Sequence, residues 1–98
     1  MNELIEQVKQ WGSDKGIFEH STPLKQHVKT QEEVTELLEA IADGDEHEIK
    51  DAIGDIVVTL ILQAEMQGTT LEVCLQQAYD VISKRNGKMV NGLFVKES

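Results

Sequence analysis

Two helical patterns joined by a very short break constrain the fold of this chain more than any other feature. The first pattern begins at Thr22-Pro23 and continues to about Ala42, and the second follows Asp45 and continues to about Met66. Threonine and aspartate are favoured helix N-caps, and proline suits the first helical position. The connecting "DGD" is too short to let the helices separate, so the sequence predicts an antiparallel helix pair.

Helices are also expected on both sides of this pair. One covers about Glu3 to Trp11 and is predicted to stop at Gly12, with a loop over residues 13–21. Another is capped by Thr70 and is predicted to end near Asn86-Gly87. The chain is therefore expected to contain four helices joined by short connections.

The C-terminal segment has a different pattern. Asn91-Gly92, the favoured pair for a two-residue turn, separates the short apolar runs "KMV" and "LFV" and predicts a hairpin. The expected fold class is all-α, an antiparallel four-helix bundle with a short C-terminal β-hairpin. The length of 98 residues fits a single domain over residues 1–98.

Charge and composition narrow the classes of partner. The chain has 18 acidic and 9 basic residues, a formal net charge of −9, which argues against nucleic acid because phosphates require clustered Lys and Arg. The longest apolar run, "IVVTLILQA", is far too short to span a bilayer, so no membrane is expected. The single cysteine, Cys74, is expected to be buried, and a cytoplasmic, reducing environment is the default expectation.

Acidic residues form a stripe beside the apolar residues on each helix of the pair. Helical residues rotate by about 100° each, so Glu33 and Glu36 lie on one side of the first helix. On the second helix, Asp51 and Glu48 fall within about 40° of Asp55. The antiparallel arrangement is expected to bring the two acidic stripes together at one edge.

The apolar stripes of the pair are expected to face each other and to form the core. They are Val34, Leu38 and Ile41 on the first helix, and Ile49, Ile53, Ile56, Val57 and Leu60 on the second.

The expected meeting of acidic side chains predicts a cation site. Carboxylates brought together repel and are costly to bury unless something neutralises them. Oxygen ligands on facing helices, with positions left open for water and phosphate, suit Mg²⁺, with Mn²⁺ as a second candidate. Asp55 is the most informative residue, because "IGDIVV" surrounds it with apolar side chains. For Glu32, Glu39 and Glu48, a solvated surface position is an equally good interpretation.

The motif "EEVTE", followed by "GDIVVTL", resembles the MazG-like family of all-α nucleoside triphosphate pyrophosphohydrolases. The signature of that family is E-E-x-x-E, a spacer, then E-x-x-D, and it falls on Glu32, Glu33, Glu36 and Asp55. The flanks "PLKQHVKTQEE" and "RNGKMVNGLFVKE" are similar to small phage-type members. The resemblance implies hydrolysis of a (deoxy)nucleoside triphosphate to the monophosphate and pyrophosphate. It also implies Glu33, Glu36 and Asp55 as metal ligands and Glu32 as the residue that orients or deprotonates water.

The sequence departs from the signature at one position. The second glutamate of the family, three residues before the aspartate, is Ala52 here. Asp51 stands one residue earlier and lies one turn before Asp55, so it is the predicted fourth ligand. Glu48, two turns before Asp55, is the alternative, and the departure also leaves open a chain that has lost activity.

Basic and aromatic residues are candidates for substrate binding, because the triphosphate that the resemblance implies needs cations. Lys29 and Lys25 lie one and two turns before Glu33, respectively. A further cluster near the predicted end of the last helix comprises Lys84, Arg85 and Lys88, although cations favour a helix C-terminus in any case. Trp11 could stack on a base or equally belong to the core.

Two other classes of function remain open at the sequence level. One is a helical regulatory module that binds a partner through its acidic face, and the other is a structural cation-binding bundle without catalysis. A chain this short buries only about 60–65% of its unfolded surface. A homodimer or homotetramer with active sites near the subunit contacts is therefore expected.

Overall fold

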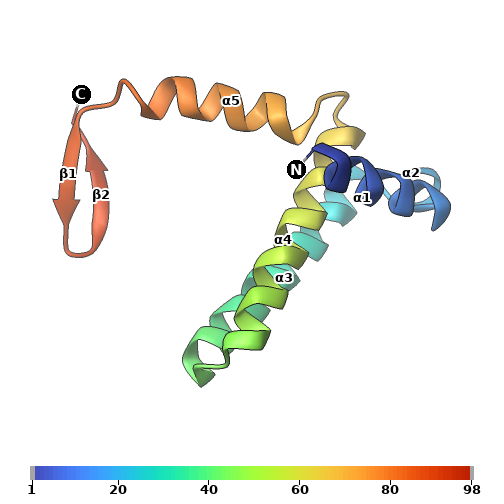
Figure 1. Cartoon of the computed structure of the whole chain (residues 1–98), viewed down its shortest axis with the longest axis horizontal. Helices are drawn as coiled ribbons and strands as arrows, with labels where there is room; N and C mark the ends of the chain where they lie inside the picture. The colour runs from blue at the N-terminus through green and yellow to red at the C-terminus, as the bar shows by residue number, and fades with distance from the viewer. Residues whose placement is uncertain (1, 98) are drawn as a thin grey trace.

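Five helices and one β-hairpin follow one another along the computed structural model, which describes residues 2–97 (Figure 1). The mostly helical class and the C-terminal hairpin are confirmed. The helices are α1 (Asn2–Asp14), α2 (Ile17–His20), α3 (Pro23–Asp43), α4 (Glu46–Met66) and α5 (Leu71–Ile82), and the strands are β1 (Gly87–Val90) and β2 (Leu93–Lys96).

The predicted caps begin the three long helices. The side chains of Thr22, Asp45 and Thr70 each accept a hydrogen bond from the backbone N–H three residues later. Gly44 ends α3 in the left-handed region, with a φ of 65°. Glycine adopts this conformation without steric cost, and the chain can therefore reverse direction within the predicted break.

The predicted stop at Gly12 is wrong, because α1 continues to Asp14. Gly12 is buried inside the helix, and a Cβ there would stand 2.6 Å from Cδ2 of Leu62 on α4. The glycine therefore permits close packing of α1 on α4 and does not end the helix. The predicted loop over residues 13–21 also contains the single-turn helix α2, which begins after Gly16.

The hairpin has the predicted turn. Asn91 and Gly92 have positive φ values of 51° and 82°, as a type I′ turn requires. Val90 pairs with Leu93 next to the turn, and Gly87 pairs with Lys96 at the open end. The prediction that the last helix reaches residues 86–87 is wrong, because α5 ends at Ile82 and the backbone of residue 86 accepts a hydrogen bond from residue 97 beyond the hairpin.

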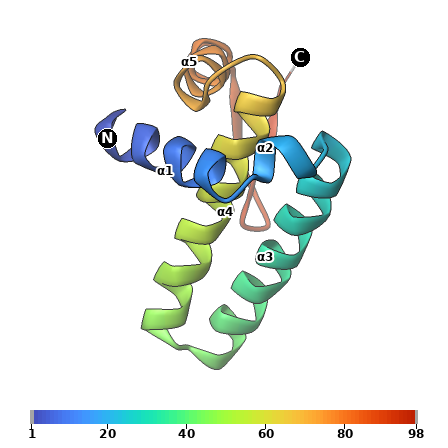
Figure 2. The same ribbon diagram turned by 90° about the vertical axis from the view of Figure 1, so that its right-hand side faces the viewer.

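Helices α3 and α4 form the predicted antiparallel pair, and α1 lies across α4 (Figure 2). The buried side chains along the seam between α3 and α4 are small or polar. They are Gln26, Glu33 and Ala40 on α3, and Ala52 and Thr59 on α4.

The prediction that the apolar stripes face each other is wrong for most of their members. Val34, Leu38 and Ile41 of α3 are exposed, as are Ile53, Val57 and Leu60 of α4. The small seam residues allow the helices to approach closely along their polar sides, which turns the bulky apolar side chains outward. We call these six residues the apolar face of the pair.

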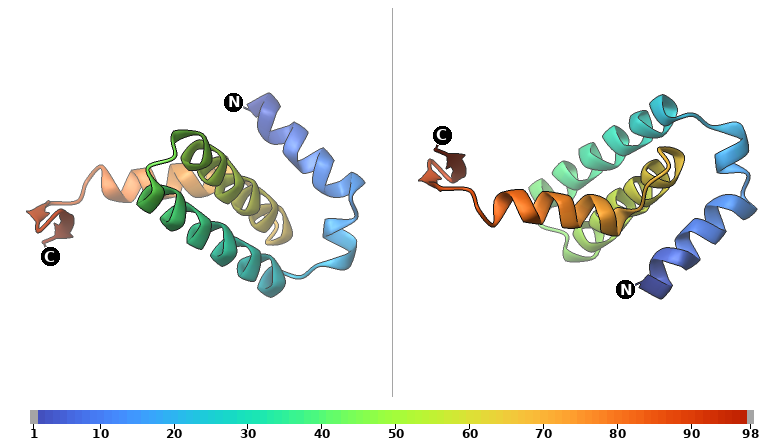
Figure 3. Two further views of the ribbon diagram at one scale, coloured as in Figure 1. Left: turned by 90° about the horizontal axis from the view of Figure 1, so that it is seen from below. Right: turned by 90° about the horizontal axis from the view of Figure 1, so that it is seen from above.

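Helix α5 and the hairpin extend away from the pair on the side opposite α1 (Figures 1 and 3). Every residue from Glu72 to Glu97 is exposed, including Cys74, so the expected burial of this cysteine is wrong. The radius of gyration is 15.8 Å, whereas a compact domain of this length has about 13 Å. The predicted four-helix bundle is therefore not confirmed within the described chain.

Residues 2–97 contain no helix that is both long enough and apolar enough to cross a membrane.

Candidate metal centre

Three carboxylates from α3 and α4 converge at the middle of the helix pair. Glu33, Glu36 and Asp55 each offer an oxygen within 4.8 Å of the oxygens offered by the other two. Glu33 and Glu36 are three residues apart on one side of α3, and Asp55 faces them from α4. The predicted meeting of the two acidic stripes thus places these three ligand candidates together.

Glu33 is the most unusual member of this cluster. Its residue is only 6% exposed, and its Oε2 atom is buried without a hydrogen-bond partner. Among residues 2–97, it is the one buried side-chain nitrogen or oxygen atom in that state. A buried polar atom without a partner loses its hydration uncompensated. The position therefore favours a ligand that meets Oε2, such as a cation.

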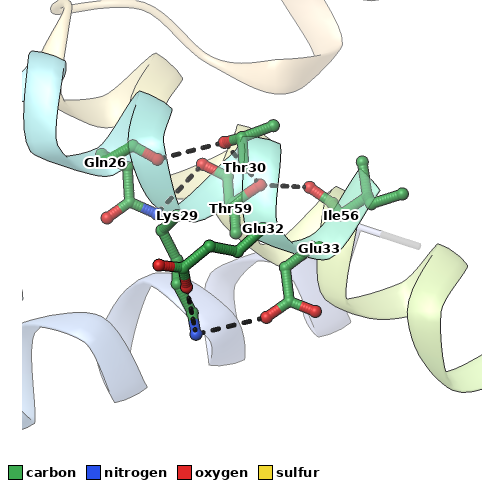
Figure 4. Close-up of polar contacts among 7 residues, drawn as sticks. All are labelled: Gln26, Lys29, Thr30, Glu32, Glu33, Ile56 and Thr59. Carbon is green, nitrogen blue, oxygen red and sulfur yellow. Dashed lines mark hydrogen bonds and ion pairs between the residues drawn. The ribbon is translucent and has the colours of Figure 1, made fainter. Parts of the chain in front are cut away.

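Lys29 supplies the positive charge nearest to Glu33. Its Nζ atom lies 3.4 Å from Oε1 of Glu33 and 3.4 Å from Oε2 of Glu32, as Figure 4 shows. These contacts raise the pKa of Lys29, and the hydrogen bond with Glu33 is the largest cause. Lys29 thus engages one oxygen of Glu33 and leaves Oε2 for another partner.

Two carboxylates of the cluster, Glu33 and Asp55, hold protons more tightly than usual. The neighbouring Glu36 carboxyl, with which a protonated Glu33 could share its proton, and then burial raise the pKa of Glu33, whereas Lys29 lowers it. Burial raises the pKa of Asp55, and the charges of Asp51 and Glu33 raise it further. Two raised carboxyl pKa values at one point mean that negative charge accumulates there beyond what Lys29 neutralises.

The cluster opens into a pocket of about 380 Å³ between α3 and α4, which we call the acidic pocket. Its wall includes Asp51 and Glu48, the two candidates for the fourth ligand, so the geometry does not separate them. Ala52, at the position of the missing glutamate, is 4% exposed and also lines the pocket. The lining residues are Glu36, Glu39, Ala40, Asp43, Asp45, Glu48, Asp51, Ala52 and Asp55.

A second pocket of about 220 Å³ lies on the other side of Asp55, and we call it the inner pocket. Trp11 is 47% exposed and forms part of its wall, so this residue is not a core residue. Lys29 and Glu33 also line the inner pocket, which places an aromatic face beside the carboxylate cluster. The lining residues are Trp11, Ile17, Gln26, Lys29, Glu33, Asp55, Val58, Thr59 and Leu62.

A polar network beside the inner pocket joins α3 to α4 (Figure 4). Thr30 Oγ1 lies 2.9 Å from Thr59 Oγ1 and 3.1 Å from the carbonyl oxygen of Gln26. Thr59 Oγ1 donates to the carbonyl of Ile56 at 2.7 Å. Sequence patterns did not predict this network. The available signal was Gln26, which lies two turns before Glu33 on the same side of α3.

Other predicted site residues lie outside the carboxylate cluster. The side chain of Glu32 is 59% exposed and contacts Lys29. Lys25 is exposed and lines neither the acidic nor the inner pocket. Lys84, Arg85 and Lys88 are exposed, and they follow α5 on the side of the pair opposite α1 (Figure 1).

A mostly helical domain with a carboxylate cluster at the seam of a helix pair is the class that the fold and the site define. Residues 21–90 match the MazG nucleotide pyrophosphohydrolase domain, and the chain belongs to this family. The match includes α3, α4, α5 and β1, and therefore all three clustered carboxylates.

A phage protein is similar over part of the chain. The chain is 38% identical over 65 residues to the "Uncharacterized 18.2 kDa protein in rep-hol intergenic region" of Haemophilus phage HP1 (strain HP1c1). The aligned region is 66% of this chain and 40% of that protein, so the chain spans less than half of the length of this relative. No solved structure matches the chain.

Proposed function

We propose that this protein hydrolyses a (deoxy)nucleoside triphosphate to the monophosphate and pyrophosphate with the help of Mg²⁺. The observation that carries the proposal is the buried, unpartnered Oε2 of Glu33 beside Glu36 and Asp55. A protein whose acidic residues form only a solvated surface would not bury one of them. Membership of the MazG family supports the same reaction class.

The residues present fit a hard divalent cation. All of the clustered donors are carboxylate oxygens, and no His or Cys belongs to the cluster within residues 2–97. Oxygen-only donor sets suit Mg²⁺ or Mn²⁺. When bound, the ion would neutralise phosphate oxygens and lower the pKa of a coordinated water.

The positions of the residues and the family resemblance support the following roles. Glu33, Glu36 and Asp55 would hold the cation, with Asp51 as the proposed fourth ligand and Glu48 as the alternative. Glu32 orients or deprotonates the attacking water from the exposed edge of α3. Lys29 contacts both glutamates of the "EE" pair and thereby fixes Glu32 relative to Glu33.

The two pockets divide the substrate between them. The phosphates would lie at the acidic pocket, and the nucleoside would enter the inner pocket, where Trp11 lines the wall and offers an aromatic side chain to the base. Lys29 contacts the phosphates at the junction, and Lys25 meets them from the first turns of α3. The proposed assembly is a homodimer or homotetramer, because the apolar face of the pair needs cover.

Pyrophosphate release from each of the common (d)NTPs in millimolar Mg²⁺ tests the proposal. Wild-type protein should release pyrophosphate from at least one of them, and chelator should stop the reaction. Glu33→Gln keeps the shape but removes a ligand charge, so it should lose most of the activity. Glu19→Gln is the matched control, because this glutamate is exposed on α2, and it should leave the rate unchanged. The absence of pyrophosphate from every nucleotide would contradict the proposal.

A second candidate is a cation-binding module without catalysis. The observation that favours it is Ala52, which lines the acidic pocket where the family signature has a glutamate. This alternative predicts that Mg²⁺ binds, as seen by calorimetry, while no nucleotide is hydrolysed.

A further inference from the structure

Residues 71–96, which comprise α5 and the hairpin, form an extended arm with little cover from the rest of the chain. The apolar side chains of the arm include Leu75, Tyr79 and Ile82 on α5 and Leu93 and Phe94 on β2, and all five are more than half exposed. A two-stranded hairpin is only marginally stable by itself in water. The arm therefore needs another surface to cover it.

The part of the arm that follows α5 is basic, although the chain as a whole is acidic. Residues 83–96 carry four of the nine basic residues of the chain and none of its eighteen acidic residues. Lys84, Arg85 and Lys88 lie where α5 meets the hairpin, and we call them the basic tip. The acidic pocket, in contrast, has seven carboxylates among its lining residues. The two regions are complementary in sign.

The acidic pocket lacks cations of its own. Lys29 is the one basic residue among those that line the acidic and inner pockets, and it already contacts Glu32 and Glu33. A nucleoside triphosphate remains anionic even with one divalent ion bound, so further cations must approach it. No residue of the arm lines either pocket of its own chain within residues 2–97.

The apolar face and the arm lie on the same side of the helix pair. Val34, Leu38 and Ile41 lie about 80–140° around α3 from Glu33, on the side away from Glu36. The exposed residues of α4 lie about 140–200° from Asp55. Because the helices are antiparallel, both stripes turn to one face of the pair and the acids turn toward the other. Figure 1 shows α5 leaving the pair on the side opposite α1, which packs near the acids.

The length of the arm matches the thickness of a packed partner. Helix α5 has 12 residues and therefore rises about 18 Å. Packed helix layers are about 8–10 Å apart. If a second copy covers the apolar face, an arm of this length crosses the helix layer of that copy and ends beyond it, on its acidic side.

We propose that the basic tip of the arm binds the phosphates in the acidic pocket of a second copy of the chain. Each active site then takes its carboxylates from one subunit and its additional cations from the other. This inference rests on the proposed function, since it assigns the tip to the same substrate. It also explains why four of the nine basic residues lie together on a segment that carries no acidic residue.

Mixed complexes test this assignment directly. One chain carries Glu33→Gln and the other carries Arg85→Ala with Lys88→Ala, each with a different affinity tag, and complexes that contain both chains are isolated after co-expression. Each parent complex should have weak activity. The arm variant should lose about 10- to 100-fold in kcat/KM because charged contacts to the substrate are removed. A mixed dimer should regain about half of the wild-type activity, because one of its two symmetric sites is intact.

Three results would overturn the assignment. They are full kcat/KM in the arm variant, a mixed complex no more active than its parents, and failure of any mixed complex to form. If the wild type hydrolyses no nucleotide, the proposed function fails, and a measurement of proximity decides the position of the arm.

For that measurement, Lys88→Cys and Glu39→Cys are placed on separate chains that carry Cys74→Ser, and the mixture is treated with a bismaleimide. A band of twice the chain mass should form in the mixture and in neither variant alone. No such band in the mixture would show that the tip does not approach the pocket of a partner.

Discussion

At the scale of single residues, the site depends on one glutamate held in a costly position. Glu33 is buried, one of its oxygens has no partner, and Glu36 and Asp55 add negative charge beside it. Such an arrangement is unfavourable for the metal-free fold and favourable for cation binding. The same residue should therefore lower the stability of the free protein and provide the affinity for the ion.

The first prediction concerns the pH dependence of stability without metal. The folded state raises the pKa of Glu33 above its ordinary value, which is about 4.3. Its contribution to stability is therefore complete below that ordinary pKa and is lost as pH rises through the raised one. In chelator, Glu33→Gln should raise the melting temperature at pH 7 and flatten its dependence on pH, because the amide carries no charge and can still accept from Lys29.

Saturating Mg²⁺ should reverse this order at pH 7. Mg²⁺ at a free concentration of a hundred times its Kd stabilises the wild type by about 2.7 kcal/mol, whereas Glu33→Gln should gain little stability from the ion. Thermal melts of both proteins with chelator and with Mg²⁺ give the comparison. A variant that melts lower in chelator and keeps the full Mg²⁺ shift would contradict this role for Glu33.

The second prediction separates the two candidates for the fourth ligand. Asp51 lies one turn before Asp55, and its charge contributes to the raised pKa of Asp55 after burial, so the two carboxylates lie close enough to interact. Glu48 is two turns away, about 10.5 Å along the axis. Asp51→Asn should therefore abolish most of the activity with the fold intact, and Glu48→Gln should cost less. Pyrophosphate release and Mg²⁺ titration on both variants decide, and full turnover in Asp51→Asn would reject the assignment.

At the scale of elements, close helix packing sets the geometry of the site. Ala40 and Ala52 let α3 and α4 approach, and the contact between Thr30 and Thr59 fixes one helix along the other. Helix α1 approaches α4 through Gly12 and brings Trp11 to the inner pocket. The position of the aromatic residue therefore depends on a glycine that sequence patterns identify as a helix stop.

The third prediction tests the close packing of α1 on α4. Gly12→Ala should destabilise the protein by about 1–3 kcal/mol despite its better helix propensity. The reason is that its Cβ would stand 2.6 Å from Leu62, which is 2% exposed and has little room to move. Gly54→Ala is the matched control, since it lies within α4 with no heavy atom in reach of the new methyl group. This control variant should gain up to about 1 kcal/mol of stability.

Denaturant unfolding at one protein concentration measures both changes. Similar effects of the two substitutions would show that Gly12 serves no packing role. Gly12→Ala should also raise KM more than it lowers kcat, because it shifts Trp11 and leaves the carboxylates in place.

At the scale of the whole molecule, the chain is organised around surfaces that it does not cover itself. The apolar face of the pair and the arm both expose large apolar side chains, and the arm extends away from the pair (Figure 3). A four-helix bundle can still form if the helix pairs of two copies pack through their apolar faces. The bundle would then be a property of the assembly and not of the single chain.

The fourth prediction follows from this arrangement. Leu38→Glu places a charge in the middle of the apolar face and should reduce the assembly to monomers. Activity should fall as well, although no carboxylate of the cluster has changed. Leu4→Glu is the control, because Leu4 is similarly exposed but belongs to α1 and not to the apolar face. Light scattering measures the mass, and a wild type that is monomeric at micromolar concentration would contradict the prediction.

The sequence by itself determined the local features of this protein. The caps at Thr22, Asp45 and Thr70, the break at Gly44 and the turn at Asn91-Gly92 depend on backbone preferences of a few neighbouring residues. The acidic stripes could be predicted for the same reason, since helical spacing alone places Glu33 and Glu36 on one side of α3.

Only the tertiary structure decided which sides of the helices meet. Periodicity marks an apolar stripe but does not say whether it is covered by the same chain, and here the small seam residues Ala40 and Ala52 packed together while Leu38 remained outside. Burial of Gly12, exposure of Cys74 and the depth of Glu33 all follow from that choice. The physical reason is that packing energy depends on contacts between residues distant in the sequence, which local patterns do not contain.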